Sequence, residues 1–223
     1  MVRKVLMVMM VFLASGVQAE QGDFNPYAKS YVSRMQAAQA PQEPPRLFAG
    51  QDRVEDYYRL LEDGYDMLGY SSFETGGVPP EEALQQAANV GAALVLVYSA
   101  GVDHVSNRGK PNTSASQGED GTIYQYFATY WTKLPPALLG IHVQRDRPDD
   151  EDALLEVMAV IKGSPAAAAG LQRGDLIRQL GEVTLRKPEA LSRAAQQYAG
   201  QTVEIVGSRA GTEFTKTVTL NRR

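Results

Sequence analysis

One short run in the last third of the chain limits the possible fold more than any other part of the sequence. Residues 163–177 read Gly-Ser-Pro-Ala-Ala-Ala-Ala-Gly-Leu-Gln-Arg-Gly-Asp-Leu-Ile. Pro165 suits the first turn of a helix, because the N–H that it lacks would have no partner there. Gly170 suits a left-handed helix end, and Leu171 can make the apolar contact that closes it. A Gly-Asp turn then leads into a β-rich segment, so the run predicts a short helix followed by a strand.

A second segment upstream, residues 138–143, reads Leu-Leu-Gly-Ile-His-Val. Together the two segments resemble a PDZ domain of the bacterial HtrA type, in which a Leu-Gly-Ile loop accompanies the Ser-Pro-Ala and Gly-Asp-Leu-Ile pattern. The resemblance covers residues 134–220 and implies a β-sandwich or partial barrel with two helices. HtrA-type proteins usually carry a serine protease domain before the PDZ domain. The chain before Leu134 is too short for a trypsin-like double barrel.

The N-terminus predicts export. Arg3 and Lys4 precede an apolar run, and Val17-Gln18-Ala19 forms a cleavage site typical of a signal peptide, residues 1–19. The run is short for a bilayer span, although an uncleaved anchor is the alternative. The sequence has no cysteine, which excludes disulfides and an N-terminal lipid on cysteine. A net charge of −4 gives no support to nucleic-acid binding. We therefore expect a periplasmic or secreted protein with no stable membrane span.

Residues 20–45 are rich in Gln, Ala and Pro and predict a flexible segment that ends in a stiff linker. Tyr27, Tyr31 and Met35 recur at helical spacing, so a short amphipathic helix is the alternative.

Residues 46–133 predict a small α/β domain. A helix over 52–63, a strand over 65–73, a helix from Pro79 and a fully apolar strand over 92–98 form a βαβ unit. Residues 99–121 predict a long exposed loop. The aromatic residues of 122–132 alternate between two faces, which both need cover from helices, the PDZ domain or a partner. With the PDZ domain at 134–223, the predicted fold class is α+β.

The PDZ resemblance also implies a binding site. A PDZ domain adds an extended peptide to an open strand edge and holds its terminal carboxylate on backbone N–H groups. The resemblance places these N–H groups at Leu139, Gly140 and Ile141, and the edge strand continues through His142 and Val143. The helix at 188–198 would form the other wall, where Leu191, Ala194 and Ala195 leave room for an apolar side chain. Core packing is an equal alternative for Leu191, and an exposed strand position for His142.

Other chemistry finds little support in the sequence. The acidic loop 146–152 would favour basic residues in a ligand or be a solvated turn, and it lacks EF-hand spacing. No zinc, Walker or dinucleotide motif is present, so no cofactor is expected. No serine lies in a motif typical of a hydrolase; Ser71 or Ser72 with His104 would be a cryptic alternative.

The sequence thus predicts a non-catalytic exported PDZ protein that binds peptide C-termini or extended segments of envelope proteins, as an adaptor, protease regulator or stress sensor. The alternative is a structural or oligomerisation PDZ domain, with partner binding carried by the N-terminal α/β domain. The sequence does not define the oligomeric state.

Overall fold

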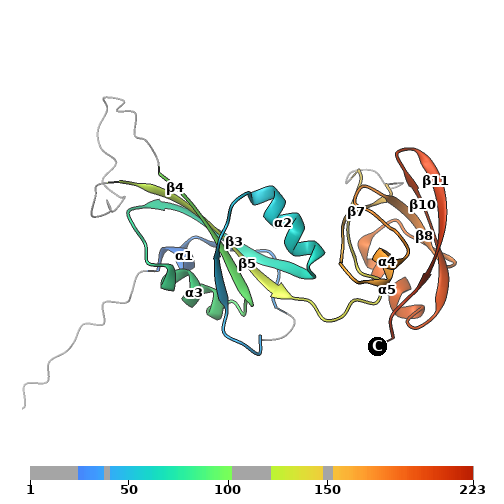
Figure 1. The fold of residues 1–223 in the computed structure, drawn as a ribbon, viewed down its shortest axis with the longest axis horizontal. Coiled ribbons are helices and arrows are strands. Elements are labelled where there is room, and N and C mark those ends of the chain that lie inside the picture. The colour runs from blue at the N-terminus through green and yellow to red at the C-terminus, as the bar shows by residue number, and fades with distance from the viewer. Residues whose placement is uncertain (1–24, 38–40, 102–121, 148–152, 223) are drawn as a thin grey trace, which may run out of the picture.

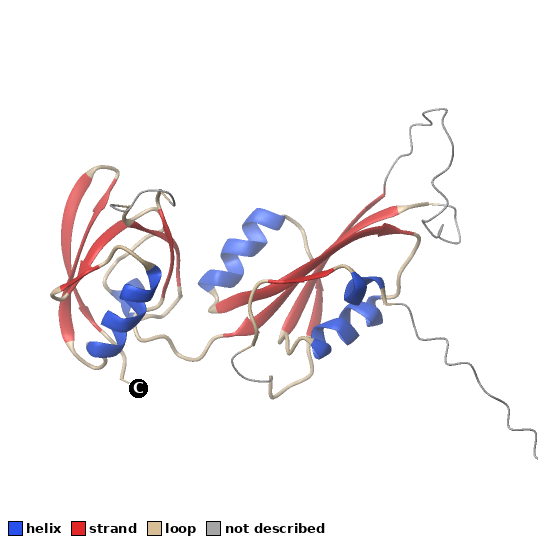
Figure 2. Ribbon diagram, turned by 180° about the vertical axis from the view of Figure 1, so that it is seen from behind, coloured by secondary structure: helices blue, strands red, loops and turns tan. Residues whose placement is uncertain are grey.

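The computed structural model describes residues 25–37, 41–101, 122–147 and 153–222. These residues form two separate β-sheets, each with its own helices (Figures 1 and 2). We call residues 25–133 the N-terminal unit and residues 134–222 the C-terminal unit. The predicted signal peptide and nearly all of the predicted loop 99–121 lie outside the described residues. In the part of the chain that the structure describes, no helix has the length and apolar character needed to span a bilayer.

The N-terminal unit is built on a five-stranded sheet. Its strands, in spatial order, are β1 (Tyr31–Ser33), β3 (Tyr65–Thr75), β5 (Tyr124–Lys133), β4 (Leu94–Gly101) and β2 (Arg46–Ala49). Strands β3 and β4 both run antiparallel to β5, which lies between them. They are therefore parallel to one another, and α3 (Pro80–Asn89) connects them. The predicted βαβ unit is present in a split form, with β5 inserted between its strands.

Helices cover both faces of this sheet. Helices α1 (Pro26–Lys29) and α3 lie on one face, and α2 (Arg53–Glu62) lies on the face nearer the C-terminal unit (Figure 1). The aromatic residues of β5 serve both sides as their alternation predicts. Tyr126 and Tyr130 join the core under α1 and α3, whereas Trp131 joins the core under α2.

The start of the N-terminal unit differs from the sequence prediction. Residues 20–45 were expected to be flexible or to form one amphipathic helix, yet the four-residue helix α1 is followed by strand β1, which pairs with β3. Tyr27 is only 1% exposed and packs edge-on against Phe73, with ring centroids 4.8 Å apart. Burial of this large ring and the backbone pairing of β1 together favour an ordered segment.

Helix α2 lies within the predicted range 52–63, and local signals mark both of its ends. The Asp52 carboxylate accepts hydrogen bonds from the N–H groups of Val54 (2.8 Å) and Glu55 (3.0 Å), and these bonds lower the pKa of Asp52. Gly64 follows the helix with φ +76°, a conformation that a Cβ would strain. The helix therefore ends before Gly64, at the border with the C-terminal unit.

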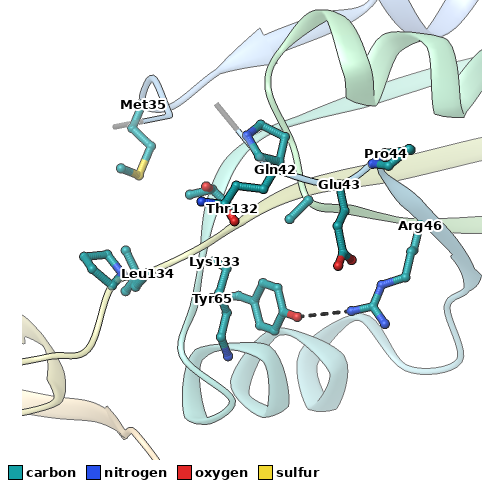
Figure 3. A pocket seen from close by; sticks show the side chains of 12 residues that line it. Met35, Gln42, Glu43, Pro44, Arg46, Tyr65, Thr132, Lys133 and Leu134 are labelled. Atoms are coloured by element: carbon teal, nitrogen blue, oxygen red, sulfur yellow. Dashed lines mark hydrogen bonds between the residues drawn. The ribbon is translucent and has the colours of Figure 1, made fainter. Parts of the chain in front are cut away.

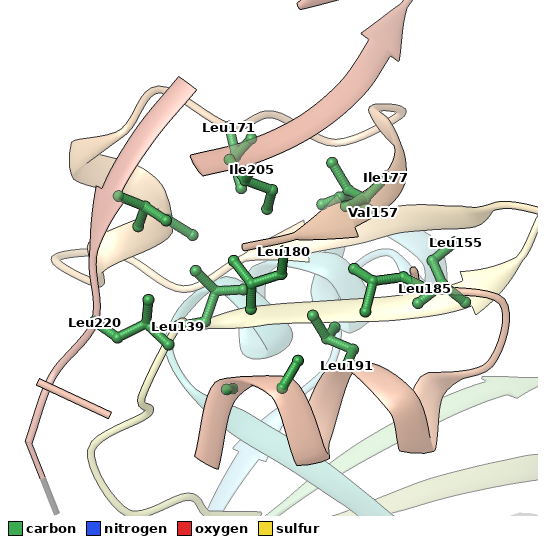
Figure 4. Packing of buried hydrophobic residues seen from close by; sticks show 14 residues of the cluster. Leu139, Leu155, Val157, Leu171, Ile177, Leu180, Leu185, Leu191, Ile205 and Leu220 are labelled. Atoms are coloured by element: carbon green, nitrogen blue, oxygen red, sulfur yellow. The ribbon is translucent and has the colours of Figure 1, made fainter. Parts of the chain in front are cut away.

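The C-terminal unit contains the second sheet. Its main strands, in spatial order, are β11 (Thr212–Thr219), β10 (Thr202–Arg209), β8 (Leu176–Leu180), β7 (Leu155–Val160) and β6 (Ile141–Arg145), while β9 (Val183–Thr184) pairs with β8. Helices α4 (Pro165–Ala168) and α5 (Pro188–Gln197) complete the unit. Leu155, Val157, Ile177 and Ile205 are fully buried in the core, and α5 directs Leu191 into it (Figure 4).

The run of residues 163–177 is held in the C-terminal unit by hydrogen bonds and an ion pair. The Ser164 hydroxyl accepts a hydrogen bond from the Ala167 N–H (3.2 Å) at the start of α4. Asp175 is completely buried and binds the Arg209 guanidinium through both oxygens, at 2.6 and 2.9 Å. The same carboxylate accepts from the Gln172 N–H (2.9 Å). Asp175 therefore links the turn before β8 to the end of β10.

Candidate functional site

Strand β6 has an open side. In the described residues it pairs only with β7, and the pair Ile141–Val160 is flanked by a hydrogen bond from the Ile161 N–H to the Gly140 carbonyl (2.9 Å). In an antiparallel ladder this bond identifies Ile141–Val160 as a pair without mutual hydrogen bonds. The N–H and C=O groups of Ile141 therefore point away from β7, toward the open edge.

The loop before β6 directs a row of N–H groups the same way. The carbonyls of Leu138, Leu139 and Gly140 accept hydrogen bonds from the N–H groups of Asn221 (3.0 Å), Ala166 (2.9 Å) and Ile161 (2.9 Å). Each carbonyl thus points into the body of the unit. In a planar trans peptide the following N–H points the opposite way, and the described residues contain no cis bond. The N–H groups of Leu139, Gly140 and Ile141 therefore face outward, where an anion can meet them.

Gly140 is essential to this geometry. Its φ of +88° is one that residues with a side chain rarely adopt. A Cβ at this position would lie 2.2 Å from the Ser164 Cβ, and the Ser164 hydroxyl also donates to the Gly140 carbonyl (3.3 Å). The loop and the start of α4 thus pack against one another, with no room for a side chain at residue 140.

Helix α5 forms the opposite wall. Leu191 and Ala195 border the space between α5 and β6. Leu191 is only 7% exposed and packs in the core, and it also lines the pocket. Ala194 is 1% exposed and packs in the core, away from the pocket lining, because it lies on the buried side of the helix. Val143 packs against the core too.

The space between these walls is a pocket of about 310 Å³. Its lining combines the loop, the first residues of β6 and the exposed rim of α5: Ala137, Leu138, Leu139, Gly140, Ile141, His142, Ile161, Leu191, Ser192, Ala195 and Gln196, together with Asp66 and Leu134. Six of the eight predicted site residues are therefore gathered in one place. Asp66, from β3 of the N-terminal unit, was absent from the prediction, since no local sequence signal links it to a site in the C-terminal unit.

His142 is not the exposed strand residue that one sequence alternative described. Its side chain lies close enough to Asp66 and Leu61 of the N-terminal unit to interact with both, and its Nε2 atom is buried without a hydrogen-bond partner among the described residues. Burial lowers the pKa of His142, because desolvation disfavours the imidazolium. The charge of Asp66 and a hydrogen bond to the backbone of Leu61 act in the opposite direction but do not reverse the shift.

The two units meet beside this pocket. The Lys162 N–H donates to the Glu62 carbonyl (2.8 Å), and the Lys162 ammonium pairs with Asp63 (2.7 Å), which raises the lysine pKa. Ala159 of β7 is fully buried against the apolar core under α2. The Arg173 guanidinium lies 3.9 Å from the ring centroid of Tyr58. The end of α2 is thus docked on β7, which brings β3 to the rim of the pocket.

A larger pocket of about 540 Å³ lies at one end of the first sheet (Figure 3). Tyr65 and Arg46 form one side and are joined by a hydrogen bond of 3.4 Å. Met35, Leu134 and three prolines contribute apolar side chains to its lining. The pocket contains Glu43 and Lys133 but no arrangement of nucleophile and base. It includes none of the predicted site residues.

The structure gives no support to a hydrolase. The Ser71 hydroxyl is completely buried, donates to the Tyr27 carbonyl (2.7 Å) and lies 3.1 Å from the Tyr130 hydroxyl. It therefore joins α1, β3 and β5 as a structural group. His104 lies outside the described residues. Within the ranges that the structure describes, no cluster of His, Asp and Glu could hold a metal ion, and no catalytic domain is evident.

Residues 156–206 match the family model of the PDZ domain. The C-terminal unit therefore contains a PDZ domain. The chain shares 20% identity with the HtrA3 PDZ domain bound to a phage-derived ligand (FGRWV); the match covers 38% of this chain and 85% of that one, with a TM-score of 0.34. The HtrA-type protease AlgW is 21% identical in structures with a decapeptide (47% and 39% coverage, TM-score 0.35) and a tripeptide (51% and 42%, 0.35). The chain spans less than half of each AlgW chain. The comparison with curated proteins gave no match.

Proposed function

We propose that this chain is a non-catalytic, exported protein whose PDZ domain captures the C-termini of envelope proteins between β6 and α5. The observation that carries the proposal is the outward row of N–H groups at Leu139, Gly140 and Ile141, held by the three carbonyl contacts behind it. Such a row suits a terminal carboxylate, because charge-assisted hydrogen bonds from several donors stabilise an anion well.

The remainder of a ligand would extend β6. The free N–H and C=O groups of Ile141 can pair with an antiparallel peptide, which is the usual mode of strand addition. The terminal side chain would enter the 310 Å³ pocket beside Leu191 and Ala195. Apolar residues at the end of the ligand fit this lining, since burial stabilises them by roughly 25 cal/mol per Å².

The exported location rests on the N-terminal sequence, Arg3-Lys4 followed by an apolar run and Val17-Gln18-Ala19. An envelope protein is therefore the proposed partner, and an adaptor, protease regulator or stress sensor is the proposed role. Each of these roles needs only reversible recognition of another protein's tail.

Selection from a library of peptides with free C-termini tests the proposal on the full chain. We expect enrichment of peptides that end in an apolar residue. The tightest selected peptide, labelled at its N-terminus, should lose at least tenfold in affinity when its C-terminus is amidated. Enrichment of no peptide would overturn the proposal. Equal binding of the amide would instead favour recognition of extended segments.

A matched pair of glycine substitutions locates the site. Gly140→Glu places a side chain where a Cβ already meets Ser164 at 2.2 Å, and adds a negative charge beside the N–H row. We expect it to abolish peptide binding. Gly77→Glu is the control, because a Cβ at residue 77 meets no atom within 4 Å. If Gly140→Glu retains full affinity while folded, as judged by circular dichroism, the groove is not the site.

One observation favours the second candidate, partner binding by the N-terminal unit. Edge strand β2 pairs only with β4 in the described residues, and its Phe48 side chain is 44% exposed. A partner that remains bound to Gly140→Glu but is lost on Phe48→Asp would support this alternative.

A further inference from the structure

The pocket of the PDZ domain is completed by a residue from the other unit. Asp66 of β3 lies in its lining together with Ile141 and His142 of β6. Its Oδ1 atom accepts from the Met67 N–H (2.9 Å). Among the described residues no lysine or arginine forms a salt bridge with Asp66, so its negative charge is available to a ligand.

The docking of the two units gives Asp66 a defined place. The Lys162 N–H binds the Glu62 carbonyl at 2.8 Å, the Lys162 ammonium binds Asp63 at 2.7 Å, and Ala159 is buried under α2. These contacts lie on the chain just before Asp66 and on the strand next to β6. Asp66 is thereby held at the rim by backbone and core contacts, not by a flexible loop.

Strand geometry indicates which ligand residue would meet this carboxylate. If the terminal residue pairs with the free N–H and C=O of Ile141, the residue before it lies opposite His142. Side chains of opposite residues share one face of a sheet, with Cβ atoms about 5 Å apart. His142 faces the N-terminal unit, whereas Ile141 faces the core that includes α5. The penultimate ligand side chain therefore points toward Asp66.

We propose that Asp66 makes the PDZ groove a composite site that prefers a basic residue, lysine or arginine, at the penultimate position of its ligand. This inference rests on the proposed function and specifies its ligand. A cation there would neutralise Asp66, which otherwise repels the terminal carboxylate bound nearby. The imidazole of His142 does not oppose it, because the buried ring favours its neutral form.

The test uses three peptides and the full chain. The tightest peptide from the C-terminal library is made with lysine, glutamine or glutamate at the penultimate position, and binding is measured by fluorescence anisotropy. We expect affinities in the order lysine, glutamine, glutamate, with about three- to fivefold between lysine and glutamine, as suits a partly exposed ion pair. The preference should shrink in 0.5 M salt relative to 0.1 M salt, because salt screens such pairs.

Charge variants then assign the preference. Asp66→Asn keeps the oxygen that accepts from Met67 and should bring the lysine-to-glutamine ratio to about one, with the glutamine peptide bound at least as well as before. Asp66→Lys should reverse the order in favour of glutamate. Glu74→Gln is the control, since Glu74 is exposed at the far end of the same strand and should leave the ratio unchanged.

The outcomes separate the two proposals. If the library yields no ligand, the proposed function and this inference both fail. If the glutamine peptide binds and is lost in Gly140→Glu, but Asp66→Asn leaves the lysine preference intact or none exists in the wild-type chain, only the composite site is overturned.

Discussion

Strands β5 and β6 differ in how far they are paired with neighbouring strands. β5 is paired on both sides and covered on both faces, and its aromatic residues fill two separate cores. β6 is paired on one side in the described residues and is preceded by a glycine loop with its N–H groups turned outward. The pairing and cover of β5 stabilise the N-terminal unit, whereas the outer edge of β6 has no strand partner among the described residues.

The largest loss of stability should follow from removal of a buried ring from β5. Trp131 is 1% exposed and packs beside Tyr57, with ring centroids 5.6 Å apart. Trp131→Ala removes a large ring from a core that cannot collapse fully, which costs about 3–5 kcal/mol. Urea unfolding followed by circular dichroism measures this loss. Phe48→Ala, at a 44% exposed position, should cost far less. Equal losses would contradict the described packing of β5.

The next effect concerns the loop that turns toward the open edge. Gly140→Ala combines an unfavourable φ with a steric clash against Ser164 at 2.2 Å, and we expect a loss of about 1–3 kcal/mol in the free energy of unfolding. Gly163→Ala isolates the first contribution, because Gly163 has φ +71° but a Cβ added there would meet no atom within 4 Å. Gly140→Ala should therefore be the more destabilising variant. The reverse order would show that the loop tolerates a side chain.

These elements differ in how well the sequence predicts them. The ends of α2 follow from Asp52 and Gly64, which act within a few residues, so the prediction was accurate there. The faces of β5 follow from simple alternation. Strand β2 was missed because its pairing is with β4, nearly fifty residues later in the chain, and four residues carry too little pattern of their own.

The residues of the candidate site also differ in how well the sequence predicts them. The loop and edge strand were placed through the PDZ resemblance, and Leu191 and Ala195 through helical spacing; the structure gathers them around one pocket. Asp66 and the burial of His142 depend on how two units dock, through Ala159 and Lys162. No spacing within either unit encodes that contact, so only a three-dimensional structure reveals it.

A smaller effect comes from filling the groove without disturbing the loop. Ala195 borders the pocket and is 9% exposed, so Ala195→Leu should extend into the space that we propose for the terminal side chain of a ligand. We expect about a tenfold loss of affinity for the selected peptide, with a modest change in stability, since overpacking also strains the core. Gln197→Leu, on the exposed side of α5, is the control. Unchanged affinity in Ala195→Leu would place the ligand elsewhere along β6.

The smallest effect that we predict is a pH dependence of stability that arises from His142 on β6. Burial lowers the pKa of His142, so the unfolded chain gains its proton first as the pH falls below about 6.5. The free energy of unfolding should therefore decrease as the pH falls from neutral to the lowered pKa of the folded state. The charge of Asp66 attracts the imidazolium and so makes this decrease smaller. His142→Gln should reduce this acid sensitivity in urea titrations at pH 7.5 and 5.5. If both chains lose the same stability, His142 is protonated as readily in the folded protein as in the unfolded one, and its burial at the docked units does not hold in solution.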